Sequence, residues 1–311
     1  MPVEPRIQEF LDKLNVAGRP PMSQIRPEVF RKMGAIGASP SFNVEEVYKV
    51  ENTSLPLEGR DLPVRIYTPE GDGPFPVLIF YHGGGWVTGD LDSHDSICRS
   101  LTNLVPCKVI SVEYRLAPEH KFPAAVDDAY DSLNWIAGHA TDFTIDPSRI
   151  VVGGDSAGGN LATVACIMAK ERKTPHVIYQ LLLYPSTGYV EEPPSIRENG
   201  EGYLLTTEIM EWFRNHYFRT EEDANNPYVS PILYKDLSGL PSSFIATAQY
   251  DPLRDVGKAY ALKLKESGVA VVYKNYEGLI HGFANFHTFV PEAQQALNEC
   301  AEQLRQVFNK Y

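Results

Sequence analysis

Ser156 lies at the centre of a G-x-S-x-G pattern formed with Gly154 and Gly158. A run of apolar, mostly β-branched residues precedes the pattern, and residues 160–170 follow it with apolar side chains at helical spacing. The sequence therefore predicts a strand, a tight turn and a helix, with the serine at the turn. Glycines on either side make room for such a turn, and the free N–H groups that begin a helix favour a developing negative charge. These features make Ser156 a candidate nucleophile.

A serine needs a base to take its proton and a carboxylate to hold that base. In a doubly wound sheet, functional loops follow the carboxyl ends of the strands. Asp251 directly follows the predicted strand 244–250, and His281 follows the predicted strand 269–276 by a short loop. We therefore predict Ser156 as nucleophile, His281 as base and Asp251 as orienting acid. The chain order Ser, Asp, His is the order of α/β-hydrolases.

Other residues compete for the acid and base roles. Asp255 lies four residues after Asp251, where it is better placed to satisfy helix N–H groups or a neighbouring arginine. Glycines flank His281 and give its ring room to turn toward a neighbouring strand end, although a loop histidine without a catalytic role is the alternative. Six further histidines have no strand leading into them and are interpreted as structural or exposed: His94, His120, His139, His176, His216 and His287.

A glycine run supplies candidates for an oxyanion hole. The apolar stretch 76–81 predicts a buried strand, and it ends in the sequence HGGGW at residues 82–86. Three consecutive glycines allow backbone N–H groups to face a ligand, whereas a purely flexible turn would cost entropy without a structural gain. His82 is interpreted as a residue that shapes this loop by hydrogen bonding. The predicted oxyanion donors are the backbone N–H groups of Gly83, Gly84, Gly85 and Ala157.

The rest of the chain supplies the elements that would position these residues. After an antiparallel edge hairpin expected over residues 44–69, apolar strand patterns alternate with amphipathic helix patterns. This alternation predicts an α/β fold with a mostly parallel sheet, flanked by helices and joined by right-handed crossovers. The predicted strands are 76–81, 107–114, 149–154, 177–184, 244–250 and 269–276, and the predicted helices of this domain are 124–138, 160–170, 256–267 and 291–308.

We expect a catalytic domain over residues 43–311 and a helical cap outside its sheet. About sixty residues separate two successive predicted strands, far more than a crossover needs. The excess predicts a cap insertion at about 187–226, with a helix over 206–218. Residues 1–42 hold two short helical patterns that are too small for a core of their own, and we expect them to form the N-terminal part of the cap.

Composition excludes several classes of protein. With 28 basic and 40 acidic residues the net charge is −12, which disfavours binding to nucleic acid. No segment reaches the roughly 18 to 20 apolar residues of a membrane span, and the first residues are charged where a signal peptide needs an apolar run. We therefore expect a cytoplasmic protein without a membrane span. The four cysteines lack C-x-x-C spacing and are interpreted as buried thiols.

Five motifs together resemble the bacterial hormone-sensitive-lipase-like family of carboxylesterases. They are HGGGW at 82–86, YRLAPE at 114–119, GDSAGGN at 154–160, DPLRD at 251–255 and HGF at 281–283. The resemblance covers essentially the whole chain. It implies an α/β-hydrolase fold with a helical cap, no metal or cofactor, and hydrolysis of esters with short to medium acyl chains.

The same resemblance assigns roles to single residues. It gives Ser156, His281 and Asp251 the roles inferred above, and it places Met210, Phe213 and Arg214 of the cap near an acyl pocket. Ordinary packing within the cap is the alternative for these last three. The stretch 114–119, with its fixed charges, is interpreted as a structural network around the site.

The leading hypothesis is a serine carboxylesterase that acts on a small-molecule ester. A ligand-binding receptor on the same fold is a second hypothesis, but such receptors typically lack the histidine that is present here as His281. A true lipase would expose a large apolar lid face, whereas the predicted cap helix carries Glu208, Glu211 and Arg214. A peptidase is the remaining enzyme class. Either a monomer or a homodimer is compatible with the sequence.

Overall fold

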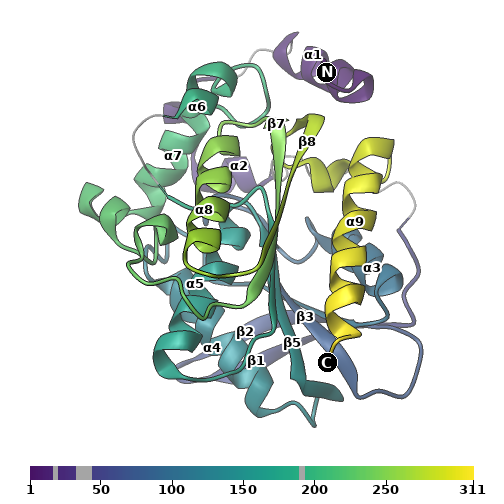
Figure 1. Cartoon of the computed structure of the whole chain (residues 1–311). Helices are drawn as coiled ribbons and strands as arrows, with labels where there is room; N and C mark the ends of the chain where they lie inside the picture. Colours follow the sequence, from purple (N-terminus) through teal and green to yellow (C-terminus); the bar gives the residue numbers. More distant parts are fainter. Residues whose placement is uncertain (17–19, 33–43, 189–192) are drawn as a thin grey trace.

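The computed structural model describes residues 1–16, 20–32, 44–188 and 193–311, which contain one eight-stranded sheet (Figure 1). The strand order is β1-β2-β4-β3-β5-β6-β7-β8. The first two strands form the antiparallel edge hairpin that the sequence predicts, β2 is antiparallel to β4, and the other neighbours are parallel. The strands are β1 (Lys49–Leu57), β2 (Arg60–Thr68), β3 (Phe75–Tyr81), β4 (Lys108–Val112), β5 (Ile145–Asp155), β6 (Tyr179–Leu183), β7 (Ser242–Tyr250) and β8 (Val271–Ile280).

Helices cover both faces of the sheet, which explains why its central strands are apolar throughout. In β3, Val77 and Ile79 point to one core, and Leu78 and Phe80 to the other, as the two-residue period of a strand requires. The first core lies under α4 (Ala124–Gly138), α5 (Ala157–Arg172) and α8 (Arg254–Glu266), and the second lies under α3 (Asp95–Leu104) and α9 (Pro291–Phe308) (Figure 1). The predicted helices 124–138 and 291–308 match α4 and α9 end to end.

Two helices are additional to those predicted. The helix α3 buries Ile97, Cys98 and Leu101, which lie on one face at helical spacing. The helix α6 (Pro194–Asn199) begins with a proline, which the first helical position tolerates because its N–H needs no partner there. The amphipathic pattern of α3 was therefore present in the sequence and was overlooked, whereas α6 has only six residues, too few to show a clear periodicity.

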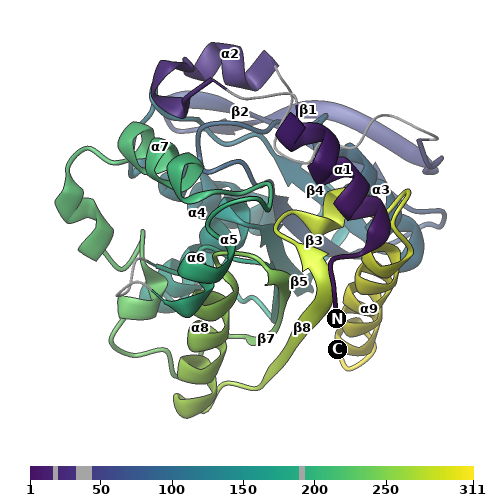
Figure 2. The same cartoon turned by 90° about the horizontal axis from the view of Figure 1, so that it is seen from above.

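The two N-terminal helices lie in different places (Figure 2). The helix α1 (Pro5–Val16) packs near the carboxyl end of β8, where Phe10 contacts Phe286 at 5.4 Å between ring centroids. The helix α2 (Pro27–Lys32) instead packs against α7 (Thr207–Tyr217), through Phe30 and Trp212. The predicted boundary between residues 42 and 43 lies outside the described residues, as do residues 189–192 of the predicted insertion.

Hydrogen bonds tie the segment before α2 to α7. The backbone N–H of Met22 donates to Glu208 Oε1 at 2.7 Å, and Trp212 Nε1 donates to the carbonyl of Ile25 at 3.0 Å. Thr206 caps the start of α7 by accepting a hydrogen bond from the N–H of Ile209. Segments about 185 residues apart in the sequence therefore form one helical layer at the carboxyl end of the sheet.

The cysteines and the helices agree with two expectations from composition. Cys98, Cys107, Cys166 and Cys300 are buried free thiols, as predicted. Burial raises the pKa of the Cys107 thiol to about 12. Within the described ranges, no helix combines the length and the apolarity that crossing a membrane requires.

The charged stretch after β4 forms the structural network that its sequence suggests. Asp128 of α4 is fully buried and accepts hydrogen bonds from the Arg115 side chain, with Nη2 at 2.8 Å, and from Arg60 Nε at 2.7 Å. The backbone N–H of Arg115 also donates to Asp128, at 2.8 Å. One carboxylate thus joins the start of β2, the loop after β4 and the helix α4.

We predict that Asp128→Ala lowers the free energy of unfolding by about 2 to 3 kcal/mol. The substitution leaves two arginines without their shared partner, and their partial exposure reduces the full cost of breaking a buried ion pair. Urea unfolding would measure the change. The matched control is Asp127→Ala, because Asp127 is the neighbouring, half-buried carboxylate of the same helix. Equal losses in the two variants would contradict the prediction.

Candidate active site

Ser156 occupies the turn between β5 and α5 in a strained backbone conformation. Its φ of 52° and ψ of −115° lie outside the regions that residues with a side chain usually adopt. Three hydrogen bonds stabilise this strained conformation. The N–H of Ser156 donates to the carbonyl of Leu183, and the carbonyl of Ser156 accepts from the N–H groups of Asn160 and Ser186. The side chain is thereby held above the sheet at the start of α5.

The two glycines of the motif are needed because the turn packs against the end of β3. A Cβ atom at Gly158 would lie 1.8 Å from the carbonyl oxygen of Tyr81, and a Cβ at Gly154 would lie 2.4 Å from the same atom. Neither distance is compatible with a side chain. The spacing of the two glycines in the G-x-S-x-G pattern therefore reflects a backbone contact between β3 and the turn.

The structure brings Ser156, His281 and Asp251 together. His281 Nε2 lies 3.0 Å from Ser156 Oγ, and His281 Nδ1 lies 2.8 Å from Asp251 Oδ2. The other carboxylate oxygen of Asp251 accepts the N–H of Leu253 at 2.7 Å, which fixes the orientation of the carboxylate. Asp251 is fully buried and His281 is 5% exposed.

The strand that leads to His281 is longer than predicted. We expected the last strand to end at residue 276 and a short loop to follow, but β8 continues to Ile280, and His281 comes directly after it. The pairing of β7 with β8 shifts register between Ala248 and Tyr250, and this irregularity carries the strand past Gly278. The histidine and Asp251 therefore both leave from the ends of adjacent strands.

Asp255, the competing acid, is bonded to Arg254 and Ser195 and not to His281. Its carboxylate accepts from Arg254 Nε at 2.8 Å and from the N–H of Ser195 at 2.9 Å, so the arginine partner that we predicted is present. Burial alone would raise the pKa of Asp255, but these hydrogen bonds and the positive charge of Arg254 outweigh burial and lower the pKa. Its role is to join α8 to α6.

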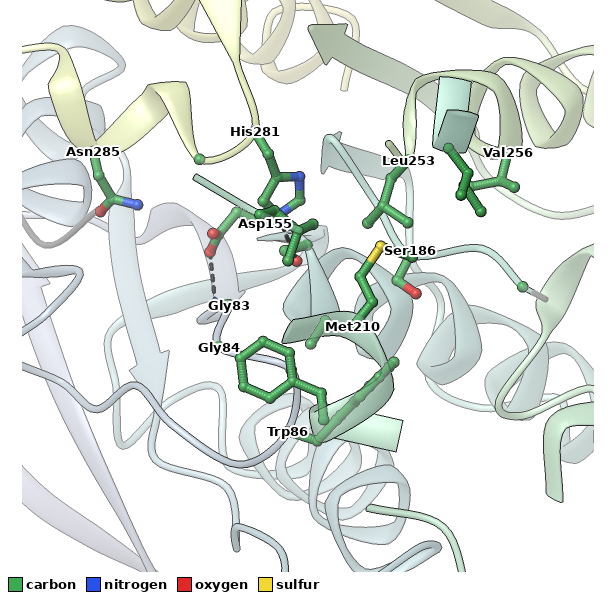
Figure 3. A pocket seen from close by; sticks show the side chains of 18 of the residues that line it. Gly83, Gly84, Trp86, Asp155, Ser186, Met210, Leu253, Val256, His281 and Asn285 are labelled. Atoms are coloured by element: carbon green, nitrogen blue, oxygen red, sulfur yellow. Dashed lines mark hydrogen bonds between the residues drawn. The ribbon is translucent and has the colours of Figure 1, made fainter. Parts of the chain in front are cut away.

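Gly83 does not contribute a free oxyanion donor, and this part of the prediction is wrong. Its N–H donates to Asp155 Oδ1 at 2.7 Å, as the dashed line in Figure 3 shows. His94 Nε2 lies 3.0 Å from the same carboxylate oxygen. Burial alone would raise the pKa of Asp155, but His94 and the Gly83 N–H reverse this effect and lower it. The buried Asp155 thus anchors the glycine loop.

Sequence reasoning missed this anchoring role of Asp155 and His94. The sequence does contain a signal for this role, because Asp155 is a charged residue at the end of an otherwise apolar strand and therefore requires a buried partner. The identity of that partner could not be read, since His94 lies about sixty residues earlier in the sequence.

Gly84, Gly85 and Ala157 present backbone N–H groups beside Ser156. Gly84 and Gly85 have φ values of 119° and 59°, which favour glycine. A Cβ at Gly85 would lie 2.2 Å from the ring of Phe213, so the loop passes directly against α7. Within the described part of the chain, these three N–H groups have no hydrogen-bond acceptor. They are available to an oxyanion.

His82 has the contacts of a loop-shaping residue. Its buried ring stacks on Tyr114 with 4.3 Å between centroids, and its Nδ1–H donates to the carbonyl of Gly83 at 2.8 Å. Tyr114 in turn donates its hydroxyl to the carbonyl of His82. Burial, assisted by the nearby His94, lowers the pKa of His82 to about 4. The ring is therefore neutral near pH 7.

A cavity opens beside Ser156 and is lined in part by α7 (Figure 3). Met210 and Phe213 line it, as expected for residues near an acyl pocket. Arg214 does not belong to its lining, because its guanidinium turns to Glu221, at 3.3 Å. A helix presents successive residues about 100° apart, so adjacent Phe213 and Arg214 cannot both face the cavity. The apolar lining consists mainly of Trp86, Ile196, Leu205, Met210, Phe213, Leu253 and Val256.

The fold and this geometry define a hydrolase with a serine at a strand-to-helix turn. A family model for the alpha/beta hydrolase fold matches residues 78–285, and the chain belongs to this family. The predicted fold and the resemblance to carboxylesterases are thereby confirmed.

Named relatives and solved structures agree. A carboxylic ester hydrolase of Mycobacterium tuberculosis, LipN, is 43% identical over 262 residues, which cover 82% of this chain and 70% of that protein. An ethyl acetate hydrolase of Pseudomonas putida is 39% identical and covers 80% of each chain. The structure of a hyperthermophilic esterase from the archaeon Pyrobaculum calidifontis superimposes with a TM-score of 0.91 at 39% identity, over 98% of this chain and 99% of that one.

We predict that His82 makes the protein less stable as the pH falls from about 6.5 toward 4. The unfolded chain binds a proton on this histidine near pH 6.5, whereas the folded state resists protonation until about pH 4. The free energy of unfolding should therefore fall by up to about 1.4 kcal/mol per pH unit from this group, and by about 3 kcal/mol in total.

Urea unfolding of the wild type and of His82→Gln between pH 7 and pH 4 would measure this contribution. The stability advantage of the wild type over the variant should shrink as the pH falls. His120→Gln is the matched control, because His120 is exposed to solvent in the folded state, and its difference from the wild type should stay constant. A constant difference for His82→Gln as well would contradict the prediction.

Proposed function

We propose that this protein is a serine carboxylesterase that hydrolyses small esters through an acyl-enzyme. The observation that carries the proposal is the continuous hydrogen-bonded series from Ser156 Oγ through His281 to the buried Asp251. Because this series starts at a strained turn beside free backbone N–H groups, it matches the requirements of acyl transfer. The names of its relatives, a carboxylic ester hydrolase and an ethyl acetate hydrolase among them, support the same activity.

In the proposed acylation step, Ser156 Oγ attacks the ester carbonyl carbon while His281 Nε2 takes the serine proton. The carbonyl oxygen becomes negative and accepts hydrogen bonds from the N–H groups of Gly84, Gly85 and Ala157, each worth about 10²- to 10³-fold in rate. When the tetrahedral intermediate collapses, the bond to the alcohol oxygen breaks and His281 returns the proton to that oxygen.

Deacylation repeats the sequence with water. His281 takes a proton from water, the oxygen of water attacks the acyl carbon, and the same N–H groups stabilise the second oxyanion. Collapse breaks the bond to Ser156 Oγ, which recovers its proton from His281. Asp251 keeps the Nδ1–H of His281 directed toward itself throughout and stabilises the cationic ring.

The helical layer of α2 and α7 serves as a cap in this proposal, and Met210 and Phe213 form part of the acyl pocket. Both residues approach Ser156 from the same helix, and Phe213 packs directly over Gly85. The acyl chain would lie against these side chains. That α1 belongs to the same cap stays a prediction, as do a cytoplasmic location and a monomeric or homodimeric state.

We predict that Ser156→Ala lowers the hydrolysis of p-nitrophenyl esters by several orders of magnitude. A series of esters from acetate to palmitate, in one detergent-free buffer, should show a maximum at short to medium chains for the wild type and no maximum for the variant. Ser148→Ala is the matched control, since Ser148 is an exposed serine near the opposite end of β5. Retention of most activity by Ser156→Ala would contradict the proposal.

A further inference from the structure

The cavity beside Ser156 has two chemically different ends. Figure 3 shows Asn285 on one side of His281, with Leu253, Val256 and Met210 on the other. The side of Met210 is mainly apolar. The side of Asn285 carries the Asp155 carboxylate, and His94, which bonds to that carboxylate, also lines the cavity.

The Asn285 side chain is buried without a partner. The residue is 3% exposed, and among the described residues no hydrogen bond reaches its Oδ1 or its Nδ2. It belongs to the turn η4 (Phe283–Phe286), where its backbone N–H donates to the carbonyl of Gly282 at 3.0 Å. The ring of Phe286, packed on Phe10 of α1, holds this turn in place. A buried amide without a partner is costly, so its fixed position in the cavity wall calls for a ligand group.

Asp155 offers a second acceptor at the same end. Its Oδ1 takes the contacts with Gly83 and His94, and its Oδ2 has no partner within the described ranges. A carboxylate oxygen and an amide together suit a hydroxyl group, because the hydroxyl can donate to an oxygen and accept from the amide nitrogen. An alkyl group at this place would leave the Asp155 Oδ2 atom and the Asn285 amide without hydrogen-bond partners.

We propose that Asn285 and Asp155 form a subsite for the alcohol part of the ester, and that it selects alcohols with a further hydroxyl group. Monoesters of diols and polyols are the substrate class. This inference rests on the proposed esterase function. His281 must return its proton to the departing alcohol oxygen, and Asn285 lies four residues after His281 on the following turn. We therefore assign the alcohol part of the ester to this end of the cavity. The acyl chain takes the Met210 end.

A pair of nearly isosteric esters tests the subsite. 2-Hydroxyethyl butyrate and n-propyl butyrate share the acyl group and differ by a hydroxyl in place of a terminal methyl. The measured quantity is the ratio of their kcat/KM values in the wild type and in Asn285→Leu. Leucine has the same branched shape as asparagine but is larger and has no amide. We expect the ratio to fall about tenfold in the variant, the size of one net hydrogen bond.

The ratio does not depend on the fraction of enzyme that is folded, so partial misfolding cannot imitate this result. If Asn285→Leu does not fold, Asn285→Ala removes the same amide without adding bulk and should give the same fall. Asn298→Leu is the matched control, because Asn298 is exposed on α9, and its ratio should equal that of the wild type.

The outcomes separate this inference from the function on which it rests. A ratio unchanged within about twofold in Asn285→Leu or Asn285→Ala, together with hydrolysis of p-nitrophenyl butyrate that depends on Ser156, would overturn the subsite alone. Absence of hydrolysis of every ester by the wild type would overturn both.

Discussion

The close backbone contact between the end of β3 and the turn at Ser156 is the constraint on which the site depends. Because Gly154 and Gly158 lack side chains, the turn can approach the carbonyl of Tyr81. This approach puts the N–H of Ala157 next to the glycine loop that continues from β3. A strand end and a helix start that are distant in sequence would thus supply donors to one oxyanion in the proposed reaction.

Two buried carboxylates stabilise the two halves of this arrangement without competing. Asp251 is bonded to His281 and to a backbone N–H of its own loop, whereas Asp155 is bonded to the glycine loop and to His94. Each charge has its own partners, which is the condition under which a buried charge is tolerated. In the proposed reaction, this arrangement would keep His281 oriented and the glycine loop rigid before substrate binds, so little reorganisation would be required.

In the proposed function, the helices α2 and α7 would act as a cap that adds specificity to this rigid centre. Phe213 fills the space above Gly85, which a Cβ on the loop would otherwise occupy, and Met210 lines the apolar side of the cavity. The opposite end is formed by a turn of the catalytic domain that bears Asn285. An ester bound across Ser156 would therefore contact an apolar wall on one side and a polar wall on the other. The acyl part would be recognised by the side chains of α7, and the alcohol part by the turn that bears Asn285.

The sequence by itself determined the parallel sheet, the strand-to-helix turn at Ser156 and the candidate acid and base. These features depend on local spacing and on which residues follow each strand, and both can be read directly from the linear sequence. Only the tertiary structure decided that Gly83 bonds to Asp155, that Arg214 turns away from the cavity and that Asn285 lies in its wall. Each of these facts is set by a neighbour from a distant segment, or by the rotation of a helix against the sheet, and local sequence patterns do not encode such contacts.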